Sequence, residues 1–320
     1  YILVDTQNMF FRARHVAGRA SSLDEKIGLA FHIMFNSVKK AHNMFNGGHV
    51  VFCMEGRSWR KDEYEPYKKN RKVVADKRSA REKEEDEFWW EAYDDFLKFV
   101  AEQTHCTAIR SPNAEADDVI ALWIQAHKDD KNVIVSTDSD FYQLINPNVS
   151  LYNGVTNQIV TVNGFYDEKD RPVIDKKTGQ PKTAPDPEWL LFEKCIRGDS
   201  SDNVFTAFPK ARTTKIKEEF EDRHNQGFIW NNFMLNRWTD HEGNEQRVKD
   251  CYERNKKLID LSQQPENIKV EVFQHIVEAQ NSKKLDQVGV RFMKFCNRYG
   301  LTRLSEHPTD HARYLNQAYA

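Results

Sequence analysis

The chain has 320 residues, of which 39% are hydrophobic and 30% are charged, and its formal net charge is -2. This length allows one large core, with room for a helical appendage. Because no run of eighteen apolar residues occurs, the sequence excludes a membrane-spanning helix and predicts no membrane partner.

The first half of the chain alternates short β-branched runs with helical patterns. These runs predict strands at residues 1–5, 49–55, 107–110 and 132–137, and a hairpin at residues 149–152 and 158–162. Amphipathic or aromatic patterns between them predict helices at residues 23–45, 88–100 and 114–127. Strands separated by helices are typical of a parallel sheet that is covered on both faces. We therefore expect an α/β fold, with a mostly parallel central sheet flanked by helices.

A connector rich in proline, glycine and lysine occupies residues 167–186 and marks a change of pattern. Beyond it the sequence is helical and contains no further convincing strand. We therefore divide the chain into a catalytic domain at residues 1–185 and a helical region at residues 186–320. Amphipathic helices of this second region are expected to pack on the catalytic domain, at residues 245–261, 270–280 and 284–299.

Basic charge is concentrated in residues 57–83, which contain eleven Lys or Arg and five Asp or Glu. Nine of the 49 acidic residues lie in the motifs described below, and without them the chain has seven more basic than acidic residues. A basic strip beside an acidic pocket that cations neutralise is typical of a protein that binds a phosphodiester.

The five cysteines are scattered, odd in number and never spaced C-x-x-C, which argues against a disulfide framework and a zinc site. The eleven histidines show no metal-binding spacing either. The chain opens on the pattern of a buried strand, and we expect no signal peptide. These features favour a reducing cytoplasm.

Acidic residues stand where the predicted strands end or where helices begin and end. They are Asp5 and Glu55 after the first two strands, Glu115, Asp117 and Asp118 in the first turn of a helix, Asp138 and Asp140 after the fourth strand, and Asp199 and Asp202 after a helix beyond the connector. Ligands of an open parallel sheet bind at the carboxyl ends of its strands. We therefore expect these nine carboxylates to meet at one edge of the sheet.

So many like charges at one edge require cations. Oxygen ligands without histidine or cysteine select magnesium or manganese over zinc. Two such ions can activate a water and stabilise the leaving oxygen of a phosphodiester. Taken one at a time, the motifs also have structural explanations. An Asp after a strand is commonly a helix N-cap, and acidic residues in the first turn of a helix interact favourably with the helix macrodipole. Gly-Asp-Ser is an ordinary loop sequence. Their joint occurrence favours phosphodiester hydrolysis.

Together these motifs resemble the 5′-nuclease (flap endonuclease) family. The family includes phage 5′-exonucleases, a phage RNase H and the 5′-nuclease domain of bacterial DNA polymerase I. The resemblance rests on EADD at 115–118, STDSD at 136–140, GDSSDN at 198–203, and Trp59-Arg60 with YKKNR at 67–71. It extends from Asp5 to about residue 268 and implies a PIN-like nuclease domain.

By this resemblance, Asp5, Glu55, Glu115, Asp117 and Asp118 would bind a first Mg2+ ion, and Asp138, Asp140, Asp199 and Asp202 a second, with Mn2+ as a substitute. Lys68 and Arg71 would contact the scissile phosphate, beside a helical arch at residues 72–88, and Asp118 would be essential to catalysis. The residues implied to bind nucleic acid are Arg12, Arg60, Tyr67, Lys69, Lys77, Arg78, Arg81, Lys210, Arg212 and Lys215.

Two positions depart from the family pattern. The family usually has Asp where Glu55 stands, and residues 204–212 lack the glycines of its helix-hairpin-helix, so residues 186–320 contain a degenerate one. Some aromatic residues also have two interpretations. By the resemblance, Tyr67 would stack on a base near the cut, but Tyr67 and Tyr64 could also simply pack on a helix surface. Trp89 and Trp90 are expected in the core.

The resemblance implies a magnesium-dependent 5′-3′ exonuclease and flap endonuclease that cuts at 5′ flaps, forks and RNA-primed DNA. Its role would be the removal of Okazaki-fragment primers during phage replication, as a monomer in the host cytoplasm, with a single-strand-binding protein or other replication proteins as partners. Two alternatives stay open. A PIN-type ribonuclease shares the acidic cluster but gives no reason for the arch motif, and a DNA-binding scaffold with a weakened site would explain Glu55 and the missing glycines.

Overall fold

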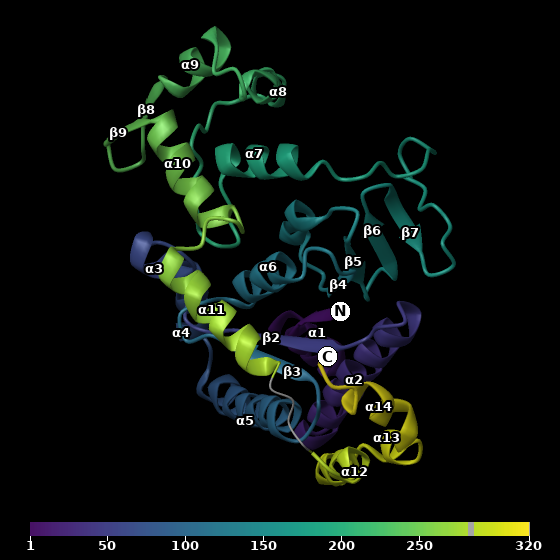
Figure 1. Cartoon of the computed structure of the whole chain (residues 1–320). Coiled ribbons are helices and arrows are strands. Elements are labelled where there is room, and N and C mark those ends of the chain that lie inside the picture. Colours follow the sequence, from purple (N-terminus) through teal and green to yellow (C-terminus); the bar gives the residue numbers. More distant parts are fainter. Residues whose placement is uncertain (281–284, 320) are drawn as a thin grey trace. The chain divides into compact units, whose positions relative to one another are not determined.

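The computed structural model describes residues 1–280 and 285–319 and is shown in Figure 1. The chain forms two compact units. Unit 1 consists of Tyr1–Arg57, Ser79–Ala184 and Glu266–Ala320, and unit 2 of Ser58–Arg78 and Pro185–Pro265. The boundary expected near residue 185 coincides with a passage from unit 1 into unit 2, and the chain returns to unit 1 at Glu266. The assignment of a catalytic and a DNA-binding domain stays a prediction.

Unit 1 is built on a seven-stranded sheet with the strand order β3-β2-β1-β4-β5-β6-β7. The strands are β1 (Ile2–Asp5), β2 (Val50–Met54), β3 (Thr107–Arg110), β4 (Asn132–Val135), β5 (Val149–Asn153), β6 (Gln158–Thr161) and β7 (Gly164–Asp167). β1 to β5 pair in parallel, and β6 and β7 add antiparallel strands at one edge. Every residue of β1, β2 and β4 is buried, as expected for central parallel strands. The predicted α/β fold is confirmed, although the sequence did not predict β7.

The helices of unit 1 pack on this sheet or on one another. They are α1 (Thr6–Ala17), α2 (Leu23–Met44), α5 (Ala80–Glu102), α6 (Ala116–Ala126), α11 (Glu266–Ala279), α12 (Val288–Arg298), α13 (Thr302–Ser305) and α14 (Pro308–Leu315), with a 3-10 helix, η1 (Ser139–Leu144). A large core joins side chains of the sheet to α1, α2, α5, α12 and α14. α6 packs on β1 and β2, and α11 packs on α6. Residue 284, at which a helix was expected to start, lies outside the described residues.

Aromatic rings dominate the part of the core where α2, α5 and α12 meet. The ring centroids of Phe35 and Phe292 are 5.0 Å apart, and those of Phe99 and Phe295 are 4.6 Å apart. Aromatic pairs at such distances stabilise a core beyond their buried area. These contacts fix α12, from the end of the chain, onto helices from its first third.

The predicted arch is helical in this structure. α4 (Lys69–Asp76) belongs to unit 2, and α5 begins at Ala80 in unit 1, with residues 77–79 between them. Ser79 and Glu82 form a capping box, which explains why α5 begins before residue 88, the start expected from its apolar stripe. Val73 and Val74 are exposed, so α4 buries little of its own surface. Its mobility in the absence of DNA stays a prediction.

Unit 2 has its own small core. Its other elements are α3 (Arg60–Glu63), α7 (Pro187–Arg197), α8 (Thr213–Asp222), α9 (Phe228–Met234), β8 (Arg237–Thr239), β9 (Glu245–Arg247) and α10 (Val248–Ile259). The core contains Phe192, Ile196, Ile216, Phe233, Met234 and Val248. The expectation of no strand beyond the connector was wrong, because β8 and β9 pair as a hairpin. At three residues each, they are too short to show a period of two.

No helix within residues 1–280 and 285–319 is both long and apolar enough to cross a membrane.

Candidate active site

Asp5 joins the carboxyl ends of two neighbouring strands of unit 1. It ends β1 and caps α1, where its Oδ1 accepts the backbone N–H of Asn8 at 3.3 Å. Its Oδ2 accepts the hydroxyl of Ser136 at 2.8 Å, and Ser136 directly follows β4. The Ser136 Oγ in turn accepts the N–H of Asp138 at 3.1 Å. The ends of β1 and β4 are thus connected through a carboxylate that is itself 6% exposed.

Glu55, one residue beyond β2, reaches the start of α6. Its Oε2 accepts the backbone N–H of Ala116, the first residue of that helix, at 3.0 Å. A carboxylate at this position is favoured by the helix macrodipole. The next residue, Gly56, permits a very close approach, since a Cβ there would lie 1.9 Å from the carbonyl oxygen of Ser111. Glu55, which departs from the family pattern, therefore caps the start of α6 through its side-chain carboxylate.

Glu115 and Asp118 lie together in the first turn of α6. They form a capping box in which Asp118 Oδ2 accepts the N–H of Glu115 at 3.2 Å. Both side chains are buried, whereas the neighbouring Asp117 is half-buried. The acidic residues of this motif therefore do stabilise the start of a helix, which is the structural explanation that the sequence allowed.

Asp138 and Asp140 follow β4 and begin η1. Asp138 Oδ1 accepts the N–H of Asp140 at 2.9 Å, so Asp138 acts as the cap of this short helix. Both residues are partly exposed. The first turn of η1 thus places two carboxylates on the strand end that is connected to Asp5.

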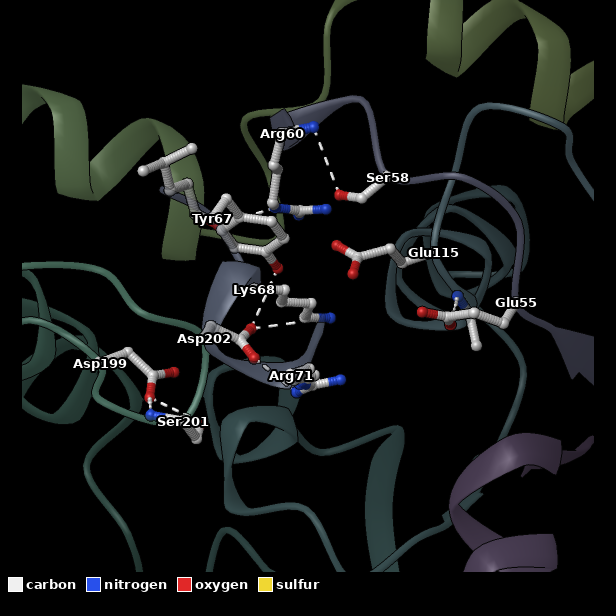
Figure 2. A network of polar contacts seen from close by, with 12 residues as sticks. Glu55, Ser58, Arg60, Tyr67, Lys68, Arg71, Glu115, Asp199, Ser201 and Asp202 are labelled. Carbon is white, nitrogen blue, oxygen red and sulfur yellow. Dashed lines mark hydrogen bonds and ion pairs between the residues drawn. The ribbon is translucent and has the colours of Figure 1, made fainter. Parts of the chain in front are cut away.

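In unit 2, Asp202 is the centre of a group of polar contacts, as Figure 2 shows. Its Oδ1 lies 2.6 Å from Arg71 Nη2. Its Oδ2 accepts the hydroxyl of Tyr67 at 3.0 Å and lies 3.7 Å from Lys68 Nζ. Two residues expected to contact the scissile phosphate are thus paired with a residue expected to bind metal.

Asp199 is held by a different set of partners in unit 2. It lies 2.8 Å from Lys194 Nζ and accepts the Ser201 hydroxyl at 2.7 Å. Burial alone would raise the pKa of Asp199, but the ammonium of Lys194 and the hydroxyl of Ser201 hold it below its usual value. The preceding residue, Gly198, has φ +78 and would place a Cβ 2.4 Å from the carbonyl oxygen of Val204. Glycine is therefore required at the start of this motif.

Two of the residues expected to bind nucleic acid are buried in unit 2. Arg60 is 2% exposed and donates from Nε to the carbonyl oxygen of Leu258 at 2.7 Å. Tyr67 is 4% exposed and packs in a small core with Val204 and neighbouring side chains. The structure thus favours packing over base stacking for Tyr67, and the assignment of Arg60 to nucleic-acid binding stays a prediction.

The remaining residues expected to bind nucleic acid are more accessible. Those that are exposed are Lys69, Lys77, Arg78, Arg81, Lys210 and Arg212. Lys215 is half-buried over the ring of Phe233. Arg12 is half-buried in unit 1, where burial lowers its pKa while Tyr152 and Asp5 oppose the shift. Trp89 lies in the core as expected, whereas Trp90 is 40% exposed.

The nine carboxylates form several local groups in this structure. In the part of the chain that is described, no three His, Cys, Asp or Glu side chains are arranged to hold a metal ion. Seven of the carboxylates belong to unit 1 and two, Asp199 and Asp202, belong to unit 2. The donor set nevertheless fits a hard divalent cation, since all its ligands are carboxylate oxygens and those of unit 1 follow β1, β2 and β4 or begin α6. The two-ion site stays a prediction.

Sequence reasoning missed two residues that hold these carboxylates. Ser136 stands within the STDSD motif, and its position after a strand was a usable signal. Lys194 lies on α7, one helical turn before the GDSSDN motif, and nothing in the local pattern distinguished it from other surface lysines.

A protein-family model described as the N-terminal resolvase-like domain of 5′-3′ exonucleases matches residues 1–176. The 5′-3′ exonuclease of Mycoplasmopsis pulmonis is 27% identical over 212 residues, which make up 64% of this chain and 60% of that protein. A flap endonuclease Xni of Psychromonas ingrahamii is 32% identical over 132 residues, 39% of this chain and 45% of the relative. The chain therefore spans less than two thirds of the length of these relatives.

Solved structures share the fold. The bacteriophage T5 D15 protein, co-crystallised with metal ions, superposes with a TM-score of 0.58 at 18% identity, covering 93% of this chain and 97% of that one. The D15 flap endonuclease in a pseudo-enzyme-product complex with DNA and metal ions gives a TM-score of 0.59 at the same identity, with 93% and 98% covered.

Proposed function

Because the chain belongs to the family of 5′-3′ exonucleases with an N-terminal resolvase-like domain, we propose that it is a metal-dependent 5′-3′ exonuclease and flap endonuclease. The observation that carries the proposal is the connection of Asp5, Ser136 and Asp138 at the carboxyl ends of β1 and β4. It places carboxylates at the edge of a parallel sheet where ligands of such folds bind. The D15 flap endonuclease, which shares the fold, was crystallised with DNA and metal ions.

In the proposed enzyme, carboxylates of unit 1 hold Mg2+, for which Mn2+ can substitute. Asp5, Glu55, Glu115, Asp117 and Asp118 form the first set of ligands, and Asp138 and Asp140 contribute to a second. Bound ions of this kind supply Lewis acidity to the phosphodiester and to water. The protein's own part is to fix these oxygens by the hydrogen bonds from Ser136, Ala116 and the capping box.

Lys68 and Arg71 provide positive charge for the phosphate in this proposal. In the structure both contact Asp202, and Arg71 is the closer of the two. A carboxylate that accepts these cations competes with any phosphate for them. Binding of a phosphodiester to Lys68 and Arg71 would therefore release Asp202, which would then be available to a cation. Charge-assisted hydrogen bonds of this type strengthen as negative charge develops on the phosphate.

The proposed substrates are 5′ flaps, forks and RNA-primed DNA, and the proposed role is primer removal from Okazaki fragments during phage replication. The exposed cations of α4 and of the start of α5 would contact the 5′ single strand, and those before and within α8 would contact duplex phosphates. The proposal places the protein as a monomer in the host cytoplasm, together with a single-strand-binding protein and other replication proteins.

The test is cleavage of end-labelled substrates with and without Mg2+. The panel contains a 5′ flap, a fork, a nicked duplex and an RNA-primed duplex, with a blunt duplex and single-stranded RNA as controls. We expect cuts near the junction of flap and fork only when Mg2+ is present. Preferential cleavage of single-stranded RNA would instead identify a PIN-type ribonuclease. Binding to the fork without any cleavage would identify a DNA-binding scaffold.

A further inference from the structure

The hydroxyl of Tyr93 is buried in unit 1 and has no hydrogen-bond partner among the described residues. Tyr93 lies on α5, is 3% exposed, and stacks on Phe10 of α1 with ring centroids 4.3 Å apart. Its hydroxyl oxygen is one of the few buried side-chain atoms that find no partner within the described residues. Most buried polar groups in folded proteins are hydrogen-bonded, so this exception requires an explanation.

Tyr93 belongs to the core cluster that contains Val4 and Met54, the residues directly before Asp5 and Glu55. Burial raises the pKa of Tyr93 far above its usual range, and the negative charges of Asp5, Glu55 and Asp94 raise it further, while Arg110 opposes them. Two of these groups, Asp5 and Glu55, end β1 and follow β2 at the candidate active site. Tyr93 therefore stays protonated, and toward these carboxylates its hydroxyl can act only as a donor.

Ring packing alone does not account for a tyrosine at this position. A phenylalanine would make the same stack on Phe10 and would leave no buried donor unsatisfied. The hydroxyl is also too far from either carboxylate for a direct hydrogen bond, since no partner is found for it. A water held between the hydroxyl and the carboxylates would satisfy both sides, because a buried water makes two to four such bonds.

We propose that Tyr93 is a positioning residue, whose hydroxyl donates a hydrogen bond to a water in the hydration shell of the divalent cation held by Asp5 and Glu55. This inference rests on the proposed function. The tyrosine fixes that water from the side of α5, whereas the carboxylates hold the cation from the ends of the strands. Outer partners of this kind commonly change metal affinity by ten- to a hundredfold.

The test is Tyr93→Phe, which removes only the hydroxyl. Free Mn2+ is followed by its electron paramagnetic resonance signal during titration into the full chain, without DNA. We expect the Mn2+ concentration at half-saturation to rise about tenfold, and the thermal unfolding temperature of the metal-free protein to stay equal or to rise. Cleavage of a 5′ flap at saturating Mn2+ should return to near the wild-type rate. The matched control is Tyr314→Phe in α14, another fully buried tyrosine, which should leave Mn2+ binding unchanged.

The possible outcomes distinguish the inference about Tyr93 from the proposed metal-dependent function. If wild type binds Mn2+ and cleaves flaps but Tyr93→Phe binds Mn2+ equally well, the inference is wrong and the proposed function stands. If wild type shows no Mn2+ binding, the metal-dependent function is wrong and the inference with it. A marked loss of unfolding temperature in metal-free Tyr93→Phe would assign the hydroxyl a structural role and would also overturn the inference.

Discussion

Replacing Glu219 with glutamine would remove a buried charge from the helix that carries Lys215. Glu219 lies on α8, is 2% exposed, and its Oε2 has no hydrogen-bond partner within the described residues. Burial raises its pKa from 4.5 to about 7, Lys215 one turn earlier lowers it, and Asp222 and Glu218 raise it. The ionised carboxylate is therefore unfavourable in the folded protein and freely solvated in the unfolded chain.

The sign of the effect follows from linkage between proton binding and folding. Because the folded state holds the proton more tightly, the contribution of Glu219 to stability is fully present below pH 4.5 and is lost as the pH rises through 7. One pKa unit corresponds to about 1.4 kcal/mol, so the full loss amounts to about 3 kcal/mol at most. Glu219→Gln has no charge to bury. We expect it to raise the free energy of unfolding at pH 8 by about 1–3 kcal/mol and to change it little at pH 4.5.

Urea unfolding of wild type and Glu219→Gln at pH 4.5, 6, 7 and 8 measures this difference. Glu218→Gln serves as the matched control, since Glu218 is the exposed neighbour on the same helix and should give parallel curves at all four values. A constant difference between Glu219→Gln and wild type across this range would refute the reasoning. It would mean that Glu219 keeps an ordinary pKa in the folded protein.

Three further predictions concern the proposed chemistry. Asp118→Asn should abolish flap cleavage while binding to branched DNA, measured by fluorescence anisotropy, stays near that of wild type; a near wild-type rate in Mg2+ would contradict the metal assignment. Lys68→Ala should lower the single-turnover cleavage rate by about a hundredfold or more. Lys210→Ala should mainly weaken binding to duplex DNA and reduce the salt dependence of that binding. Equal effects of the two variants on the cleavage rate would contradict the assignment of Lys68 to catalysis and Lys210 to binding. Blocking the free 5′ end of a flap with a bulky protein before enzyme is added should inhibit cleavage if the strand passes through the arch at residues 72–88, and undiminished cleavage would show that it does not.

Much of unit 1 could be predicted because its strands carry a strong local signal. β1 and β4 are fully apolar runs apart from one polar end residue each, and buried parallel strands have this pattern. The position of Asp5 and of Asp138 at the strand ends then follows from chain order alone. Their hydrogen-bonded connection through Ser136 depends on the pairing of β1 with β4, a strand order that the sequence did not predict.

Contacts between distant parts of the chain could not be predicted. Arg60 was assigned to nucleic-acid binding from the Trp59-Arg60 motif, and no pattern in the sequence indicated that it contacts the carbonyl of Leu258, 198 residues away. Tyr67 and Asp202 likewise come from separate segments of unit 2 and meet only after folding. Local periodicity contains no information on such pairs. The hairpin of β8 and β9 was missed for another reason, since two three-residue strands fall below the length at which alternation can be recognised.

The aromatic cluster of α2, α5 and α12 has a consequence for folding during synthesis on the ribosome. Phe35 and Phe99 emerge before residues 185–265 of unit 2, and Phe292 and Phe295, which contact them, emerge after those residues. Unit 2 is synthesised in between and has a core of its own. Unit 2 can therefore become compact while aromatic rings of unit 1 are still exposed to solvent. Synthesis interrupted before α12 would leave a nascent chain with an apolar face that chaperones bind and that favours aggregation.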